Sequence, residues 1–461
     1  MDKYKKLFSN TVIFAIGTFS SKVLVFLLMP LYTWALSPDE YAVTDLIVQS
    51  GNLLLPLVSL GIVNSIIRFG LDKSVRKSDV FTSGLITVAC GFSGLILLSP
   101  LLSMIDIFSG NILLVYIFTL TSTLRSLCSQ FVRARGMVRL FAFDGVLSTI
   151  TTILFNVLFL VVFKFGVIGY VMAIVCSDLL SSVFLFFVAS LHRFVQIKTF
   201  NKKIWKEMLI YALPLIPNTI CWWITNVSDR FIVTYMLGHH MDGLYAVSYK
   251  LPTIITLFSS IFMSAWQISA ITEENGRSKF FTQIFRSYSS LIFMAGAAII
   301  PFSKILVMLF AQPSYYDAWQ FIPFLVMATV FNCFGTFLGS VFAVEKKSIL
   351  MFLTISGGAA LNVALNFLLI PLWGVNGAAF ATFASYVLVF ILRFIGTRRY
   401  IKIQIPLFQF LSNIVVLLGM ALIMIFEIPG WIVFEALLLI ALLALNLRDL
   451  LQTAMKLLKR K

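Results

Sequence analysis

The sequence predicts an all-α polytopic membrane protein with about fourteen transmembrane helices. Three observations favour this fold class: 60% of the 461 residues are hydrophobic, only 12% are charged, and the mean hydropathy is +0.99. A soluble domain of this length would carry far more polar surface. A membrane β-barrel would alternate apolar and polar residues in short segments, whereas residues 153–163 and 414–426 form long, nearly unbroken apolar runs.

About fourteen apolar segments are long enough to cross a bilayer, at roughly 20–25 residues per span. They cover residues 10–36, 41–67, 80–104, 111–132, 140–163, 166–191, 208–237, 243–271, 285–310, 318–344, 349–371, 375–397, 407–427 and 431–447. The first segment follows three lysines, as a signal peptide would, but it is too long and has no small-residue cleavage site. We therefore expect it to remain as the first span.

The basic residues fall in alternate loops. Lys and Arg gather after residues 67, 132, 191, 271, 344 and 397 and in the C-terminal tail, while the loops between are short and poor in bases. Cytoplasmic loops hold the excess of Lys and Arg, so both chain ends are predicted to lie in the cytoplasm. The net charge of +16 follows from this topology and needs no nucleic-acid partner.

The two halves of the chain carry similar short segments. Residues 41–44 read Tyr-Ala-Val-Thr and residues 245–248 read Tyr-Ala-Val-Ser, and at nearly the same offset residues 166–169 and 374–377 both read Gly-Val-x-Gly. Matches of this length also arise by chance, and that alternative stays open. A parallel repeat predicts two six-helix bundles, then two extra helices with a basic cytoplasmic tail, at residues 1–200, 201–402 and 403–461.

Four bases lie inside predicted spans: Lys22, Arg125, Arg230 and Lys250. A charge at a helix centre costs about 2.5–3.5 kcal/mol on insertion scales, so it usually serves a function. Pairing with intramembrane acids is one explanation, and it suits Arg230 beside Asp229 as well as a binding role does. Lys22 and Arg125 have no acid in their own spans, which favours a wet, basic cavity that binds an anionic substrate.

Polar and aromatic side chains follow the same spans at helical spacing. We expect the cavity to include Asp45, Gln49, Asn52, Asn218, Trp222, Asp229 and Tyr249. The first three recur at steps of three and four residues and therefore share one helix face. Asp178 and Asp229 are the acids expected to bind a coupling ion. Alternatively, such rows are hydrogen-bonded helix contacts, and the aromatic residues are interfacial anchors.

No motif of an enzyme or cofactor site occurs. The sequence contains no Gly-x4-Gly-Lys-Ser/Thr, His-Glu-x-x-His, Cys-x-x-Cys or Gly-x-Ser-x-Gly. The cysteines lie in apolar stretches and are expected to pack as small hydrophobic residues. His239 and His240 are expected to be solvated in a short outer loop. The sequence therefore predicts no cofactor, no metal site and no enzymatic activity.

Five stretches, in chain order, carry a family resemblance. They are residues 30–41, with Pro30, Pro38 and Tyr41; residues 64–69, Asn-Ser-Ile-Ile-Arg-Phe; residues 133–136, Arg-Ala-Arg-Gly; residues 229–250, with Asp229, Arg230, Gly238, Gly243, Tyr245 and Lys250; and residues 362–379, with Asn362, Asn366, Pro371 and Gly374. Together they resemble polysaccharide flippases of the Wzx/PST group, within the multidrug/oligosaccharidyl-lipid/polysaccharide (MOP) exporter superfamily, which also contains the MATE transporters.

The resemblance implies two six-helix bundles around a central cleft, with two additional helices. It implies that undecaprenyl-pyrophosphate-linked oligosaccharide units, of the kind used for O-antigen or capsule, cross the bacterial cytoplasmic membrane by alternating access. The four intramembrane bases would then bind the diphosphate. The implied partners are the lipid bilayer, the lipid-linked oligosaccharide, either H⁺ or Na⁺, and a glycan polymerase.

Two other functions stay open at this stage. A MATE-like, cation-coupled drug exporter would need an acidic cavity for cationic substrates, whereas the intramembrane charges here are mainly basic. A membrane glycan polymerase usually has a large outer loop with catalytic residues, and every predicted outer loop is short. A lipid-linked oligosaccharide flippase is therefore the leading prediction.

Overall fold

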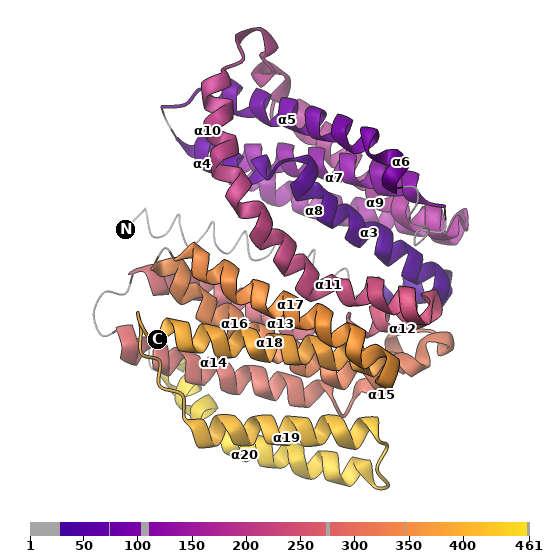
Figure 1. Ribbon diagram of the computed structural model, residues 1–461, viewed down its shortest axis with the longest axis vertical. Coiled ribbons are helices and arrows are strands. Elements are labelled where there is room, and N and C mark those ends of the chain that lie inside the picture. Colours follow the sequence, from indigo (N-terminus) through magenta and orange to yellow (C-terminus); the bar gives the residue numbers. More distant parts are fainter. Residues whose placement is uncertain (1–27, 73, 103–109, 273–276, 346, 459–461) are drawn as a thin grey trace. The chain divides into compact units, whose positions relative to one another are not determined.

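The chain is helical throughout the part that the structure describes. The computed structural model describes residues 28–72, 74–102, 110–272, 277–345 and 347–458 (Figure 1), and no strand occurs in these ranges. The chain divides into two compact units, one up to Trp223 and one from Ile224 onward. The boundary lies within α11 (Ile216–Leu237), so each unit holds part of this helix. The division at residues 200 and 402 stays a prediction.

The first unit is a helix bundle built on α7 and α9. The described α-helices of this unit before α11 are α2 (Met29–Ala35), α3 (Pro38–Val58), α4 (Ile62–Leu71), α5 (Lys77–Leu97), α6 (Ser99–Leu102), α7 (Ile112–Ala134), α8 (Val138–Asn156), α9 (Gly166–Val188) and α10 (Lys202–Ala212). α9 packs against α7 and α8, and α7 also packs against α3 and α4. Fully buried Ile66, Phe81 and Phe131 form part of the apolar core that holds α4, α5 and α7 together.

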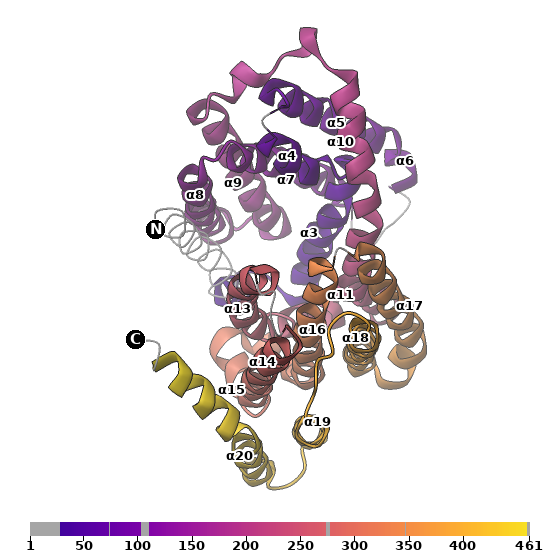
Figure 2. The same cartoon turned by 90° about the vertical axis from the view of Figure 1, so that its left-hand side faces the viewer.

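The second unit is built on α16, its most deeply buried helix. The α-helices of this unit after α11 are α12 (His239–Ser248), α13 (Thr253–Thr272), α14 (Arg277–Ile299), α15 (Ser303–Phe310), α16 (Ile322–Val344), α17 (Ser348–Trp373), α18 (Val375–Thr397), α19 (Leu407–Ile425) and α20 (Trp431–Leu458). α18 packs against α16 and α17 (Figure 2). α19 and α20 pack on each other at the edge of this unit, and α20 also contacts α14.

The helix lengths and hydropathy fit a multi-span membrane protein. Among the described residues, ten helices are long and apolar enough to cross a membrane, or up to twelve if each of two bent pairs is one span. The bent pairs are α12 with α13, at 43°, and α14 with α15, at 68°. Most of the predicted first span, 10–36, lies outside the described residues. The predicted all-α, multi-span fold class is confirmed.

One predicted loop is a helix. Residues 239–242 were expected to form a short outer loop, but they make the first turn of α12. Gly238 has φ 88°, a backbone conformation that favours glycine, and this allows α12 to begin directly after α11. Asp242 is fully buried there and accepts a hydrogen bond from Thr234 Oγ1 at 2.9 Å. The polar composition of these residues reflects this buried contact and the helix start.

Close packing between α17 and α18 depends on Gly377. A Cβ atom at this position would lie 2.3 Å from the Leu369 carbonyl oxygen, and that backbone cannot move without shifting α17. We expect Gly377→Ala to destabilise the protein by about 1–3 kcal/mol, as overpacked cores are.

The matched control is Gly94→Ala on α5, because a Cβ there meets nothing within 4 Å. That change should leave stability unchanged or raise it, since alanine favours a helix over glycine. Thermal unfolding in detergent would compare the two variants. Equal midpoints would show that α17 and α18 do not need this close approach.

Candidate functional site

Two clusters of polar side chains within the described residues, one in each unit, are candidates for a functional site. The acid–arginine cluster of the first unit comprises Ser122, Arg125, Asp144, Asp178 and Ser181. The aspartate–tyrosine cluster of the second unit comprises Asp229, Tyr245, Tyr249 and Thr382. The charged members of both clusters lie on helices of membrane-spanning length, where buried charge points to function, while Tyr245 and Tyr249 belong to the bent pair of α12 and α13.

In the acid–arginine cluster, one guanidinium bridges three helices. Arg125 Nη1 on α7 lies 3.0 Å from Asp178 Oδ1 on α9, and its Nη2 lies 3.8 Å from Asp144 Oδ2 on α8. Arg125 Nε also donates to Ser181 Oγ at 3.1 Å. The hydroxyl of Ser181 donates to Asp144, and that of Ser122 donates to Asp178.

This geometry corrects the expectation for Arg125. The absence of an acid from its own span suggested a cation without a carboxylate partner, but both partners come from neighbouring helices. Asp144 lies close to the start of the predicted span 140–163, so its depth was not apparent. With two carboxylates and one guanidinium, the cluster carries one excess negative charge when both acids are ionised.

In the aspartate–tyrosine cluster, three hydroxyl groups converge on one carboxylate. Asp229 on α11 is fully buried. Its Oδ2 accepts hydrogen bonds from Tyr245 Oη at 2.8 Å, from Tyr249 Oη, and from Thr382 Oγ1 on α18 at 3.0 Å. Its Oδ1 accepts the backbone N–H of Arg230 at 3.0 Å. The carboxylate thus links α11, the α12 region and α18.

Arg230 and Lys250 lie in or beside this cluster. The Arg230 guanidinium is 4.5 Å from the centroid of the Tyr249 ring, a cation–π distance, and the residue is buried. Tyr249 thereby contacts both the arginine and the Asp229 carboxylate. Lys250 follows Tyr249 directly, is half-buried, and lies at the break between α12 and α13.

An amide network extends the aspartate–tyrosine cluster along α17. Asn362 Nδ2 donates to Thr382 Oγ1 at 3.2 Å, and Asn366 Nδ2 donates to Asn362 Oδ1 at 3.0 Å. Both asparagines are fully buried. Ser228 Oγ donates to Asn362 Oδ1 at 3.2 Å, which returns the network to α11. These bonds fix the position of Thr382 against Asp229.

The predicted polar row on α3 lies in the first unit. Asp45 is buried, Gln49 is half-buried and Asn52 is exposed, so the row runs from the core towards the surface. Asn52 Nδ2 lies 3.5 Å from Gln49 Oε1. Trp223 Nε1 donates to the Gln49 carbonyl at 2.9 Å, which ties α11 to α3.

The remaining predicted residues are more dispersed. Asn218 is half-buried and Trp222 is 53% exposed, both on α11. Lys22 lies outside the described residues. Among the predicted site residues, the structure brings Arg125 together with Asp178, and Asp229 together with Arg230 and Tyr249. A basic cavity shared by all four bases stays a prediction.

The sequence analysis did not assign several members of these clusters to the site, although it named Tyr245, Asn362 and Asn366 for the family resemblance. Asn362 and Asn366 stand one helical turn apart in an apolar segment, and Tyr245 opens the repeated Tyr-Ala-Val segment. These patterns could have indicated that the three residues belong to a polar site. Thr382 and Ser181 had no such pattern. Among the described residues, no three His, Cys, Asp or Glu side chains are grouped so that they could hold a metal ion.

A third polar group fastens α20 to its neighbours. Arg286 Nε on α14 lies 2.8 Å from Asp449 Oδ1 on α20, and Gln409 Nε2 on α19 donates to Asp449 Oδ2 at 2.9 Å. Asn413 and Asn446 exchange amide hydrogen bonds of 2.9 and 3.1 Å. These bonds join α14, α19 and α20, which makes a structural role the simplest explanation for them.

Solved membrane transporters share this fold. The lipid II flippase MurJ, in an inward closed conformation, superposes with a TM-score of 0.70 and 14% identity, over 95% of this chain and 100% of that one. An inward-facing multidrug resistance MATE transporter of the MOP superfamily gives a TM-score of 0.63 and 13% identity, over 83% and 94%. The outward-facing conformation of a MATE transporter gives 0.59 and 15%, over 85% and 94%. At these identities the likeness shows the fold alone.

The sequence itself matches a family. No curated protein matches it. Residues 7–267 match the family model described as "Polysaccharide biosynthesis protein". This region holds the described part of the first unit and the whole of α11, and it includes Asp229, Arg230, Tyr245 and Tyr249. Because the match covers more than half of the 461 residues, the chain belongs to the polysaccharide biosynthesis protein family.

Proposed function

We propose that this protein is a flippase that moves a lipid-linked oligosaccharide across the bacterial cytoplasmic membrane for polysaccharide biosynthesis. The observation that supports this most is the agreement between two independent likenesses. The family match concerns polysaccharide biosynthesis, and the fold is similar over 95% of the chain to that of MurJ, a lipid II flippase. The proposed cargo is an undecaprenyl-pyrophosphate-linked oligosaccharide unit, and the proposed mechanism is alternating access.

The proposed contacts to the diphosphate come from the bases in or beside the aspartate–tyrosine cluster. Arg230 and Lys250 are the described candidates, and Lys22 is retained with them. Charge-assisted hydrogen bonds to phosphate are stronger in a partly dehydrated site than in water. Arg125 is proposed to position α7, α8 and α9 through its two carboxylates, rather than to meet the cargo directly.

Coupling to a proton is proposed for the first unit. Asp144 and Asp178 compete for one guanidinium, so adding a proton to either acid removes the excess negative charge. Such a change would alter the contacts that join α7 to α8 and α9. Asp178, expected from the sequence to bind a coupling ion, shares this role with Asp144, while Asp229 stays the candidate of the second unit.

A second candidate function is a cation-coupled drug exporter. Two observations favour it: MATE transporters have similar folds, and Asp144, Asp178 and Asp229 place three buried carboxylates in the spans. Cells producing this protein would then expel cationic dyes. A flippase for an anionic lipid-linked sugar would not change dye accumulation.

Lys250 and Arg230 provide the direct test of the flippase proposal. We expect Lys250→Gln and Arg230→Gln each to lower surface polysaccharide at least tenfold in the natural host lacking its own copy. A hydrogen bond to a charged group contributes about 1.5–3 kcal/mol. The loss of one such contact to the cargo therefore accounts for a tenfold or larger fall in surface polysaccharide. Surface glycan would be measured together with the amount of protein in the membrane.

The matched control is Lys206→Gln, which neutralises an exposed base on α10. It should leave surface polysaccharide at the wild-type level. Normal glycan in both cluster variants, with normal membrane abundance, would refute the binding role of these two bases. Dye efflux without any effect on glycan would favour the exporter instead.

A further inference from the structure

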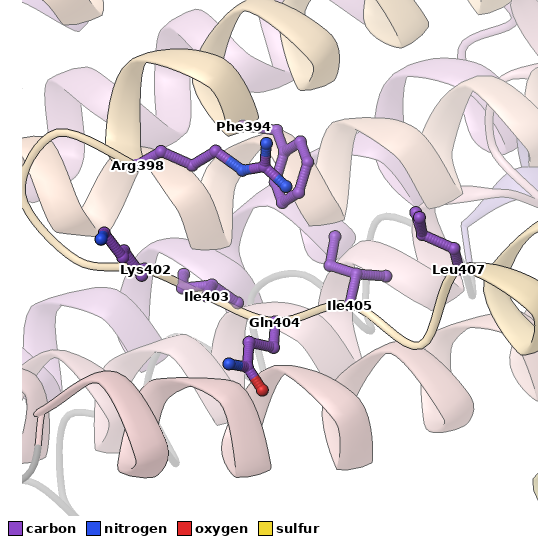
Figure 3. Close-up of a pocket in the computed structure, with 7 residues that line it drawn as sticks. All are labelled: Phe394, Arg398, Lys402, Ile403, Gln404, Ile405 and Leu407. Carbon is purple, nitrogen blue, oxygen red and sulfur yellow. The ribbon is translucent and has the colours of Figure 1, made fainter.

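A pocket of about 380 Å³ lies beside the segment that connects α18 to α19, residues 398–406, here named the strap (Figure 3). The pocket is lined by Phe394, Arg398, Lys402, Ile403, Gln404, Ile405 and Leu407. Two of these seven residues are basic and none is acidic. The volume lies within the range of small-molecule sites, about 300–1,000 Å³. The proposed transport mechanism uses none of these residues.

The strap is held against α14, so the wall of the pocket is defined. The Gln404 backbone N–H donates to Thr282 Oγ1 at 3.0 Å, and Ser278 Oγ donates to the Lys402 carbonyl. Ile403, between these two anchored residues, is only 3% exposed. The alternation of a buried isoleucine with polar neighbours leaves Lys402 and Gln404 exposed along the strap.

The basic side of the pocket suits a phosphate group. The Arg398 guanidinium carbon lies 4.7 Å from the centroid of the Phe394 ring, and Figure 3 shows the planar head group against that ring. Stacking holds the head group in place and leaves its N–H groups available to an anion. Lys402 adds a second positive charge from the strap, and arginine with lysine is a common combination for phosphate.

The apolar side of the pocket suits a hydrocarbon chain. Ile405 lies on the strap, and Leu407 begins α19, a helix of membrane-spanning length. Leu407 is 61% exposed and the next residue, Phe408, is 83% exposed. Basic and apolar side chains thus lie together at the start of a helix of membrane-spanning length. The start of such a helix is expected at the level of the lipid head groups. A free phosphate ion would use only the basic side.

We propose that the strap pocket binds an anionic glycerophospholipid of the leaflet on its own side of the membrane. Arg398 and Lys402 would bind the phosphate, and Ile405 and Leu407 would contact the start of an acyl chain. The distribution of bases predicts that this side is cytoplasmic. The pocket shares no residue with either buried cluster, and its assignment does not depend on the transported substrate.

The binding of short-chain phosphatidylglycerol to purified full-length protein in neutral detergent tests the proposal. We expect the double variant Arg398→Gln/Lys402→Gln to raise the apparent Kd at least fivefold. The control Arg193→Gln/Lys198→Gln removes two exposed bases from the first unit and should leave the Kd unchanged. Short-chain phosphatidylcholine, which has no net charge, should bind weakly to all three proteins. An equal Kd in the double variant and wild type would overturn the proposal.

The apolar contact has its own variant. The double variant Ile405→Ser/Leu407→Ser should raise the apparent Kd for phosphatidylglycerol at least threefold. It should leave the Kd for glycerol phosphate unchanged. If glycerol phosphate binds wild type as tightly as the lipid does, the pocket is a site for soluble phosphates and the lipid assignment is wrong. Because every changed residue except Ile405 is exposed, thermal unfolding should show that these variants fold normally.

Discussion

Arg125→Leu is expected to lower the free energy of unfolding by about 3 kcal/mol, as the removal of one partner from a buried ion pair does. The Asp144 and Asp178 side chains are only 1% and 6% exposed, so water cannot replace the lost guanidinium. The two carboxylates would then repel each other between α8 and α9. Thermal unfolding of the detergent-solubilised protein measures the effect.

Two further variants separate charge from shape in this cluster. Arg139→Leu removes an exposed arginine at the start of α8 and should leave the midpoint unchanged. The triple variant Arg125→Leu/Asp144→Asn/Asp178→Asn removes all three charges and should recover most of the lost stability. If the single and triple variants unfold alike, charge balance does not hold these helices together.

The triple variant also tests the role of Arg125 in transport. A stable triple variant that exports no glycan, together with a host whose export collapses when the proton gradient is removed, would support proton coupling by the acids. A stable triple variant that exports normally would show that none of the three residues takes part in coupling or binding.

Asp229→Ala is expected to cause a loss of similar size, about 3 kcal/mol or more, because each buried donor without a partner costs about 1–3 kcal/mol. The change removes the shared acceptor of Tyr245, Tyr249 and Thr382 in a fully buried place. Asp229→Asn keeps a carbonyl oxygen and should cost less. The exposed Asp317 provides the control, and Asp317→Ala should leave the unfolding midpoint unchanged.

A double-mutant cycle isolates the contact to Tyr249. Asp229→Asn and Tyr249→Phe should combine non-additively, with an interaction energy of about 0.5–3 kcal/mol, because the two side chains share a hydrogen bond. Additive losses would show that the hydroxyl and the carboxylate act independently. The same variants, assayed for surface glycan, would separate a structural role of Asp229 from a role in the transport cycle.

Family membership was predictable because its signals are local. The short segments around Pro38, Asp229 and Gly374 stand in family order along the chain, and a family match to residues 7–267 requires no knowledge of contacts. The start of α12 was harder to predict from the sequence. Residues 239–242 are polar enough to resemble a loop, and only packing shows that Asp242 is buried against Thr234.

The sequence alone determined that the protein is helical and crosses the membrane many times, because hydropathy and charge act within each segment. It also located the costly charges, Arg125, Arg230 and Asp229 among them. Only the tertiary structure decided what these charges contact. Arg125 meets an acid 53 positions further along the chain, and Asp229 meets a threonine 153 positions away. Such contacts depend on which helices pack together, and helical periodicity within one segment carries no information about that.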